Sequence, residues 1–147
     1  MFYTCEFEVF ESEGLLVATP YCMDGGTQGE SWQDLGEMVA DWLRGEVNYR
    51  IMHDIELPAQ TFGNSPRKGG TNIVVSVQAG LDTIERVTAA EAARMLGVTP
   101  GRVSQMLAAN QLQGWREGHS SYVTRDSVEA RLNADPHAGR PKALACA

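Results

Sequence analysis

One stretch of the sequence, "VTAAEAARMLGVTPGRVSQML", constrains the fold more than any other. Thr88 and Glu91 have capping-box spacing, in which a hydroxyl caps the N3 amide and a carboxylate reaches back to the cap amide. Gly97 is a natural C′ residue, which ends a first helix in the left-handed region. Thr99 then caps a second helix, and Pro100 takes its N1 position, where a missing N–H costs nothing. The stretch therefore predicts two short helices joined by a tight turn.

Each predicted helix has an apolar face that would bury against the rest of a small core. The first helix presents a face of small apolar residues, namely Ala92, Ala93 and Leu96, with Val87 ahead of them. The second helix is expected to run to about Ala109 and to turn inward Val103, Met106, Leu107 and, at its end, Asn110. Its outward face is then formed by Gly101, Arg102, Ser104, Gln105 and Ala108.

The segment after these helices, "LQGWREGHSSYVT", reads as a strand, a glycine-containing turn and a second strand. The following "TRDSVEARL" predicts a short helix that turns Val128 and Leu132 inward. This order of helix, turn, helix, hairpin and helix resembles the excisionase and MerR-like winged helix-turn-helix DNA-binding domains, over residues 85–132. The family members often carry a basic or polar residue where Gly101 stands.

The resemblance and the side-chain chemistry together give a candidate DNA-binding set. Arginine and glutamine read guanine and adenine edges in the major groove, which suits Arg102 and Gln105. Residues at the tip of the hairpin could contact phosphates, which fix the register on the duplex. A solvated surface arginine is the competing interpretation, and for Trp115 packing of the hairpin onto the core is favoured over base stacking. The candidate set is Thr99, Pro100, Gly101, Arg102, Ser104, Gln105, Arg116, His119 and Ser120.

The formal net charge of −7 disfavours DNA binding for the chain as a whole, but the charge is unevenly distributed. Residues 1–81 contain four basic and twelve acidic side chains, a balance of −8, whereas residues 82–147 contain eight basic and seven acidic ones, a balance of +1. Such a split predicts two domains with different partners. We expect a partner-binding domain at 1–81, a DNA-binding domain at 85–132, and a disordered tail at 133–147, which is rich in Pro, Gly and Ala.

The front half predicts strands arranged around one helix. "FYTCEFEVF" alternates with period two, so that Tyr3, Cys5, Phe7 and Val9 face one way and Thr4, Glu6 and Glu8 the other. "GLLVATP" completes a hairpin, and a short third strand is expected near Thr27. Ser31 caps a helix with the stripe Leu35, Met38, Val39, Trp42 and Leu43, and "NIVVSVQAG" closes the sheet. The predicted fold class is α+β, with the order β-β-(β)-α-β followed by the small winged helix-turn-helix domain.

The strand "YTCEFEVF", the turn into "GLLVATP" and the segment "GGTQGES" leading into the helix resemble the HicB antitoxin family. That resemblance implies a partial RNase H-like fold, which binds a small basic HicA-like toxin that cleaves mRNA. The chain departs from the family pattern in two places. "TPYCMDGGTQG" lacks the second proline of the usual motif, and the loop from Gln60 to Gly69 is longer than usual.

The front half could instead be an RNase H-like nuclease, since phosphodiester cleavage with two metal ions needs converging carboxylates such as Glu6, Glu8 and Asp24. The favoured interpretation places Glu6 and Glu8 on the polar face of a half-buried strand. The three cysteines Cys5, Cys22 and Cys146 have neither CxxC spacing nor a histidine cluster, so no zinc site or disulfide framework is expected. Cys5 and Cys22 fall in expected strands. We predict no catalysis, no cofactor and no bound metal.

The resulting hypothesis is a type II antitoxin that blocks a small mRNA-cleaving toxin and represses its own operon. The alternative is a stand-alone transcriptional regulator whose front half dimerises or senses a ligand. No apolar run reaches the ~18 residues of a membrane span, and a cytoplasmic location is expected. The small basic excess of the back half means that one copy would neutralise few phosphates. A homodimer or higher homo-oligomer on a two-fold double-stranded operator is therefore expected, with the acidic half supplying the interface.

Overall fold

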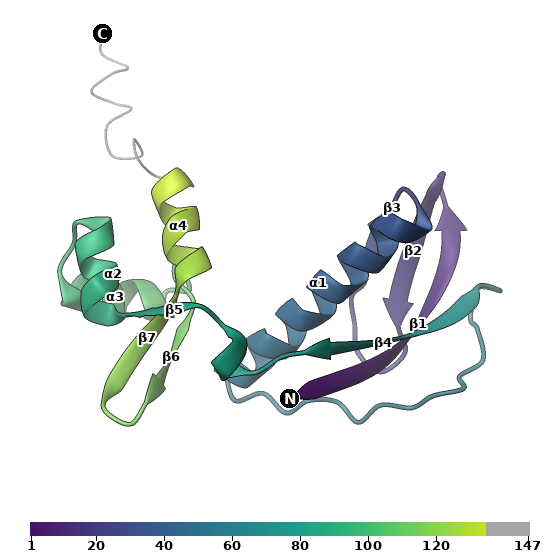
Figure 1. Ribbon diagram of the computed structural model, residues 1–147, viewed down its shortest axis with the longest axis horizontal. Coiled ribbons are helices and arrows are strands. Elements are labelled where there is room, and N and C mark those ends of the chain that lie inside the picture. The colour runs from purple at the N-terminus through teal and green to yellow at the C-terminus, as the bar shows by residue number, and fades with distance from the viewer. Residues whose placement is uncertain (135–147) are drawn as a thin grey trace, which may run out of the picture. The chain divides into compact units, whose positions relative to one another are not determined.

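The computed structural model describes residues 1–134 and has an α+β fold (Figure 1). The chain divides into two compact units between Thr83 and Ile84. Unit 1 is Met1–Thr83, and unit 2 begins at Ile84. The expected domains are residues 1–81 and 85–132, and the observed division lies between them. Most of the expected tail lies outside the described residues, and its first two positions belong to the last helix, which continues to Ala134.

Unit 1 is built on a four-stranded antiparallel sheet. Its strands are β1 (Phe2–Ser12), β2 (Leu15–Pro20), β3 (Thr27–Gly29) and β4 (Thr71–Gln78), in the spatial order β3-β2-β1-β4. The short third strand near Thr27 is thus confirmed. In the β1–β4 ladder, Phe7 lies opposite Ile73 and Glu6 lies opposite Val74. A short 3-10 helix, η1 (Leu81–Thr83), follows β4.

Helix α1 (Trp32–Met52) covers one face of this sheet. Its buried side chains Leu35, Val39, Leu43 and Val47 pack against those of Cys5, Phe7 and Val9 from β1. The Ser31 hydroxyl accepts a hydrogen bond from the Asp34 amide, as the spacing predicts. The Asp34 carboxylate, however, accepts from the amide of Glu30 rather than from that of Ser31.

In the part of unit 2 that the structure describes, three short helices and a small sheet pack around a second hydrophobic cluster. Its elements are β5 (Arg86–Thr88), α2 (Ala89–Leu96), α3 (Pro100–Ala108), β6 (Gly114–Glu117), β7 (Ser120–Thr124) and α4 (Arg125–Ala134). Strand β5 was not expected from the sequence; it pairs with β7 to give a three-stranded sheet in the order β5-β7-β6. The cluster is closed by Val103 and Met106 of α3, Val123 of β7 and Val128 of α4.

Several sequence-based assignments are wrong, and one of them is Met38, which was expected in the inward stripe of α1 but is 42% exposed. Asn110 is exposed and has a φ of 59°, because it lies just past the C-cap of α3 where the chain turns away from the helix. Leu132 is exposed because, within residues 84–134, the hydrophobic cluster of unit 2 takes Val128 from α4 and no residue after it. Cys22 lies in the irregular segment after β2 and not in a strand, whereas Cys5 is buried in β1.

None of the helices in residues 1–134 is both long enough and apolar enough to cross a lipid bilayer.

Candidate functional site

The turn between α2 and α3 is fixed by hydrogen bonds at three helix ends. Thr88 Oγ1 accepts from the Glu91 amide at 3.1 Å, and Glu91 Oε1 accepts from the Thr88 amide at 3.0 Å, so the capping box is complete. The Thr88 amide is the main reason that the pKa of Glu91 lies below its ordinary value. Gly97 ends α2 with a φ of 69°, and Thr99 Oγ1 accepts from the Arg102 amide at 3.1 Å. The start and direction of α3 are therefore set by local contacts.

The inner face of α3 fixes which side chains point outward. Val103 and Met106 are buried against Ala92 and Ala93 of α2, whose small side chains let the two helices approach closely. Thr99, Pro100, Gly101, Arg102, Ser104 and Gln105 are all exposed, so the first two turns of α3 bring six of the nine candidate residues together. The Arg102 guanidinium donates to Gln105 Oε1 at 3.4 Å, which aligns two long polar side chains on one strip.

The other three candidate residues lie around the turn of the β6–β7 hairpin. Arg116, His119 and Ser120 are exposed, and Gly118 makes the turn possible with a φ of 60°. Trp115 is buried and its indole Nε1 donates to Glu117 at 2.9 Å, in keeping with a packing role. The candidate residues thus form two groups, one on α3 and one on the hairpin.

Arg86 is a further cation of this unit that the sequence reasoning missed. Its guanidinium lies 4.5 Å from the centroid of the Tyr122 ring and 5.7 Å from that of Trp115, and it forms an ion pair of 3.8 Å with Glu117. These contacts arise from the pairing of β5 with β7, which no local sequence pattern predicts. Arg86 therefore braces one side of the hairpin.

In unit 1, the expected polar face of β1 is covered by the loop between α1 and β4. Glu6 and Glu8 are 5% and 1% exposed, which corrects the prediction that they lie on a solvated strand face. Glu6 accepts from the amides of Gly63 and Asn64 and from the Asn64 side chain. Glu8 accepts from the amides of Arg67, Lys68 and Gly70 at 2.8–2.9 Å. The two carboxylates therefore hold the loop onto the sheet face opposite α1.

The loop amides also control the ionisation of both carboxyl groups. The Asn64 amide is the main cause that keeps the pKa of Glu6 below its ordinary value, against the opposing effect of burial. For Glu8, burial acts to raise the pKa, but the amides of Gly70, Lys68 and Arg67 together outweigh it and the net pKa is lowered. Both carboxylates are thus engaged by loop amides, so they do not form an open pair ready to bind metal ions.

The variant Glu8→Gln is expected to unfold about 5–10 °C below the wild type at neutral pH, because the amide group cannot accept from three backbone donors. A carboxyl whose pKa is lowered by folding stabilises the fold above its unfolded-state pKa and loses that effect as pH falls through the folded-state value. The difference in unfolding temperature between Glu8→Gln and the wild type should therefore shrink as the pH falls below 4.5, the ordinary pKa of a glutamate side chain. Thermal unfolding followed by circular dichroism from neutral pH to about pH 3 measures it.

The matched control is Glu11→Gln, because Glu11 lies on the same strand and is exposed. It should leave the unfolding temperature almost unchanged. An equal loss of stability in the two variants would contradict the role assigned to Glu8.

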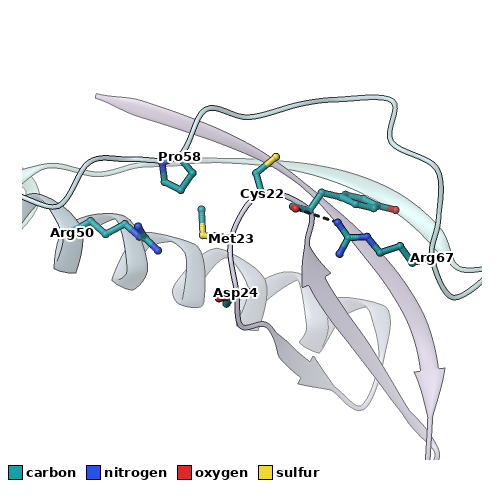
Figure 2. Close-up of a pocket in the computed structure, with 7 residues that line it drawn as sticks. Cys22, Met23, Asp24, Arg50, Pro58 and Arg67 are labelled. Atoms are coloured by element: carbon teal, nitrogen blue, oxygen red, sulfur yellow. Dashed lines mark hydrogen bonds between the residues drawn. The ribbon is translucent and has the colours of Figure 1, made fainter.

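A groove of about 440 Å³ lies in unit 1 between α1, the segment after β2 and the loop (Figure 2). Arg50 and Arg67 lie near its opposite ends, with Asp24 and Met23 between them. The Arg67 guanidinium donates to the Tyr21 carbonyl at 3.2 Å, and Arg50 Nε donates to Glu46 at 3.2 Å. The arginines have structural partners and further N–H groups that remain able to donate.

Among residues 1–134, no group of three or more His, Cys, Asp or Glu side chains is arranged to hold a metal ion. Comparisons of the chain with family models, with curated proteins and with solved structures gave no match.

Proposed function

We propose that unit 2 is a winged helix-turn-helix domain that binds double-stranded DNA with α3 in the major groove. The observation that carries the proposal is the exposed strip of Thr99, Arg102 and Gln105 on a helix whose opposite face is locked by Val103 and Met106. A recognition helix needs both features, because its base-reading side chains must protrude from a rigidly held backbone. Arg102 suits guanine and Gln105 suits adenine.

The hairpin β6–β7 supplies the wing in this proposal. Arg116, His119 and Ser120 are exposed around its turn, where a guanidinium, an imidazole and a hydroxyl can contact phosphate oxygens. Such contacts position the domain without reading sequence. The buried Trp115 and its contact with Arg86 stiffen the wing.

Unit 1 is the partner-binding domain in this proposal, with a HicB-like partial RNase H fold, and the whole chain is a cytoplasmic antitoxin. The support is its charge: residues 1–81 carry twelve acidic against four basic side chains, and of these acids only Glu6 and Glu8 are buried. A surface of this sign attracts a small basic toxin and repels the nucleic acid that the toxin would cleave. The antitoxin blocks the toxin by binding, without turnover, and represses the shared operon through unit 2.

The groove of unit 1 favours a second candidate, a stand-alone regulator that senses a ligand. Arg50 and Arg67 border it and retain donors for an anionic small molecule. The geometry gives no comparable support to the nuclease alternative, because Glu6 and Glu8 accept hydrogen bonds from the loop that covers them.

The tagged full chain, recovered from its native cells, is expected to retain a small basic protein in equal amount and to enrich one sequence from random double-stranded DNA. DNA affinity should fall with added salt, with a slope of about −0.9 per phosphate neutralised. Mass spectrometry identifies the protein and sequencing identifies the DNA.

Each arm of this experiment tests one half of the proposal. Enrichment of one DNA sequence without a protein partner would replace the antitoxin with a stand-alone regulator. A protein partner without DNA enrichment would contradict the role of unit 2.

A further inference from the structure

We infer that the outer edge of β4 is a dimer interface, at which a second copy of this chain adds its own β4 in antiparallel orientation. Strand β4 is the last strand on its side of the sheet, and its ladder with β1 leaves every second residue with its N–H and C=O directed outward. Within residues 1–134, no hydrogen bond reaches these outward backbone groups. The edge is therefore able to accept another strand.

The two edges of this sheet differ in a way that points to β4. Proteins protect exposed edges with short strands, charged side chains, prolines or bulges. Strand β3, at the opposite edge, has three residues and is followed by the acidic Glu30. Strand β4 has eight residues, "TNIVVSVQ", with no charge and no proline, and its register with β1 runs without a bulge. One edge is protected, whereas the other is open along its full length.

The side chains of β4 suit a partner strand on both faces of the sheet. Ile73, Val75 and Val77 lie on the face toward α1, and Val74, on the opposite face, is 57% exposed. Residues directly opposite one another in an antiparallel pair place their side chains on the same face. A two-fold axis perpendicular to the sheet therefore passes midway between the two copies of one residue, which near the middle of β4 is Val74 or Val75. Both registers pair β-branched residues across the seam and cover part of Val74.

Charge identifies the occupant as a second copy rather than a basic partner. Residues 1–81 carry a balance of −8, so two copies approach closely only where the contact surface is neutral. Strand β4 is neutral throughout, and the nearest acids on β1, Glu6 and Glu8, are turned onto the loop amides. A basic partner would find no acidic side chain on this strand with which to form an ion pair. A neutral seam is what self-association requires.

The geometry of this pair also fits a two-fold operator, a step that rests on the proposed function. The chain continues from β4 toward unit 2, and antiparallel pairing sends the two copies of this connection to opposite ends of the seam. The two copies of unit 2 are then related by the same two-fold axis, which is the symmetry of an operator with two half-sites.

The test is the mass of the full chain in solution, without DNA, by sedimentation equilibrium. The wild type is expected at twice its 16.0 kDa chain mass. Val74→Lys should weaken dimerisation about 100-fold, because it brings a lysine from each copy to the seam. The fold should be unaffected, because Val74 is exposed in the single copy. Gln28→Lys is the matched control, since it adds the same charge to β3 at the opposite edge, and it should remain dimeric.

Hydrogen exchange provides a second readout that does not depend on a variant. The outward amides of β4 should be protected in concentrated wild-type protein and should exchange freely on dilution, whereas the amides of β3 should not respond to concentration. A monomeric wild type, or a Val74→Lys variant as dimeric as the wild type, would overturn the inference. Because DNA is absent, failure of DNA binding leaves this result unchanged.

Discussion

The double variant Arg102→Ala/Gln105→Ala is expected to bind its selected DNA about 100- to 1,000-fold more weakly than the wild type. Each side chain can form a bidentate pair with one base, and such a pair contributes ~1–3 kcal/mol of discrimination. Both side chains are exposed on α3. Within the protein, the double substitution removes the hydrogen bond between them. Fluorescence anisotropy with the enriched duplex measures the loss, and circular dichroism checks that the fold is retained.

The control for this prediction is Arg131→Ala, which removes the same charge from α4. It is expected to lower affinity by less than about threefold, because one distant charge contributes little at physiological salt. The double variant should also relax sequence preference at two base pairs, which loss of general attraction to phosphate would not do. Equal losses in the two proteins, or unchanged base preference, would show that α3 is not the reading element.

The sequence predicted the parts of unit 2 that depend on neighbours in the chain. Thr88 with Glu91, Gly97, and Thr99 with Pro100 act through hydrogen bonds or backbone angles within a few residues, and all behave as their spacing predicts. The inward positions of Val103 and Met106 follow from helical periodicity alone. Local rules were therefore sufficient to predict which side chains of α3 point outward.

The sequence did not predict what depends on contacts between distant segments. The alternation in β1 assigns Glu6 and Glu8 to a solvated face, because a polar residue at every second position usually means exposure. The partners that bury them lie 57 to 62 residues further along the chain, and they are backbone amides, which carry no side-chain signature. Strand β5 is hidden for a similar reason, since three residues are too few to show a period.

The end of a hydrophobic cluster is equally invisible in a local pattern. Val128 and Leu132 are four residues apart and should share a face of α4, yet Val128 is buried and Leu132 is exposed. Periodicity defines which side of a helix is apolar but not how far the core extends along it. Unit 2 is small, and its core ends before the last turn of α4.

The variant Phe7→Ala is expected to lose about 3–5 kcal/mol of unfolding free energy in unit 1, a large part of the ~5–15 kcal/mol typical of a domain. Phe7 is fully buried between β1 and α1, where its ring meets that of Trp42 edge to face at 5.9 Å. The substitution leaves a cavity that the neighbouring Leu35 and Val39 can fill only in part.

Unit 2 should remain folded in this variant, because its hydrophobic cluster contains no residue of unit 1. Hydrogen exchange resolved by residue measures both effects at once: the amides of β1 should lose protection, while those of Val103 and Met106 keep it. Phe2→Ala is the matched control, since Phe2 lies on the same strand but is 72% exposed, and it should change protection little. Equal loss of protection in both units of Phe7→Ala would mean that they unfold as one body. A third outcome is that unit 2 keeps its protection while DNA binding weakens. This outcome would mean that unit 1 supports DNA binding through dimerisation, because without a dimer held at β4 two copies of α3 are no longer brought to the operator together.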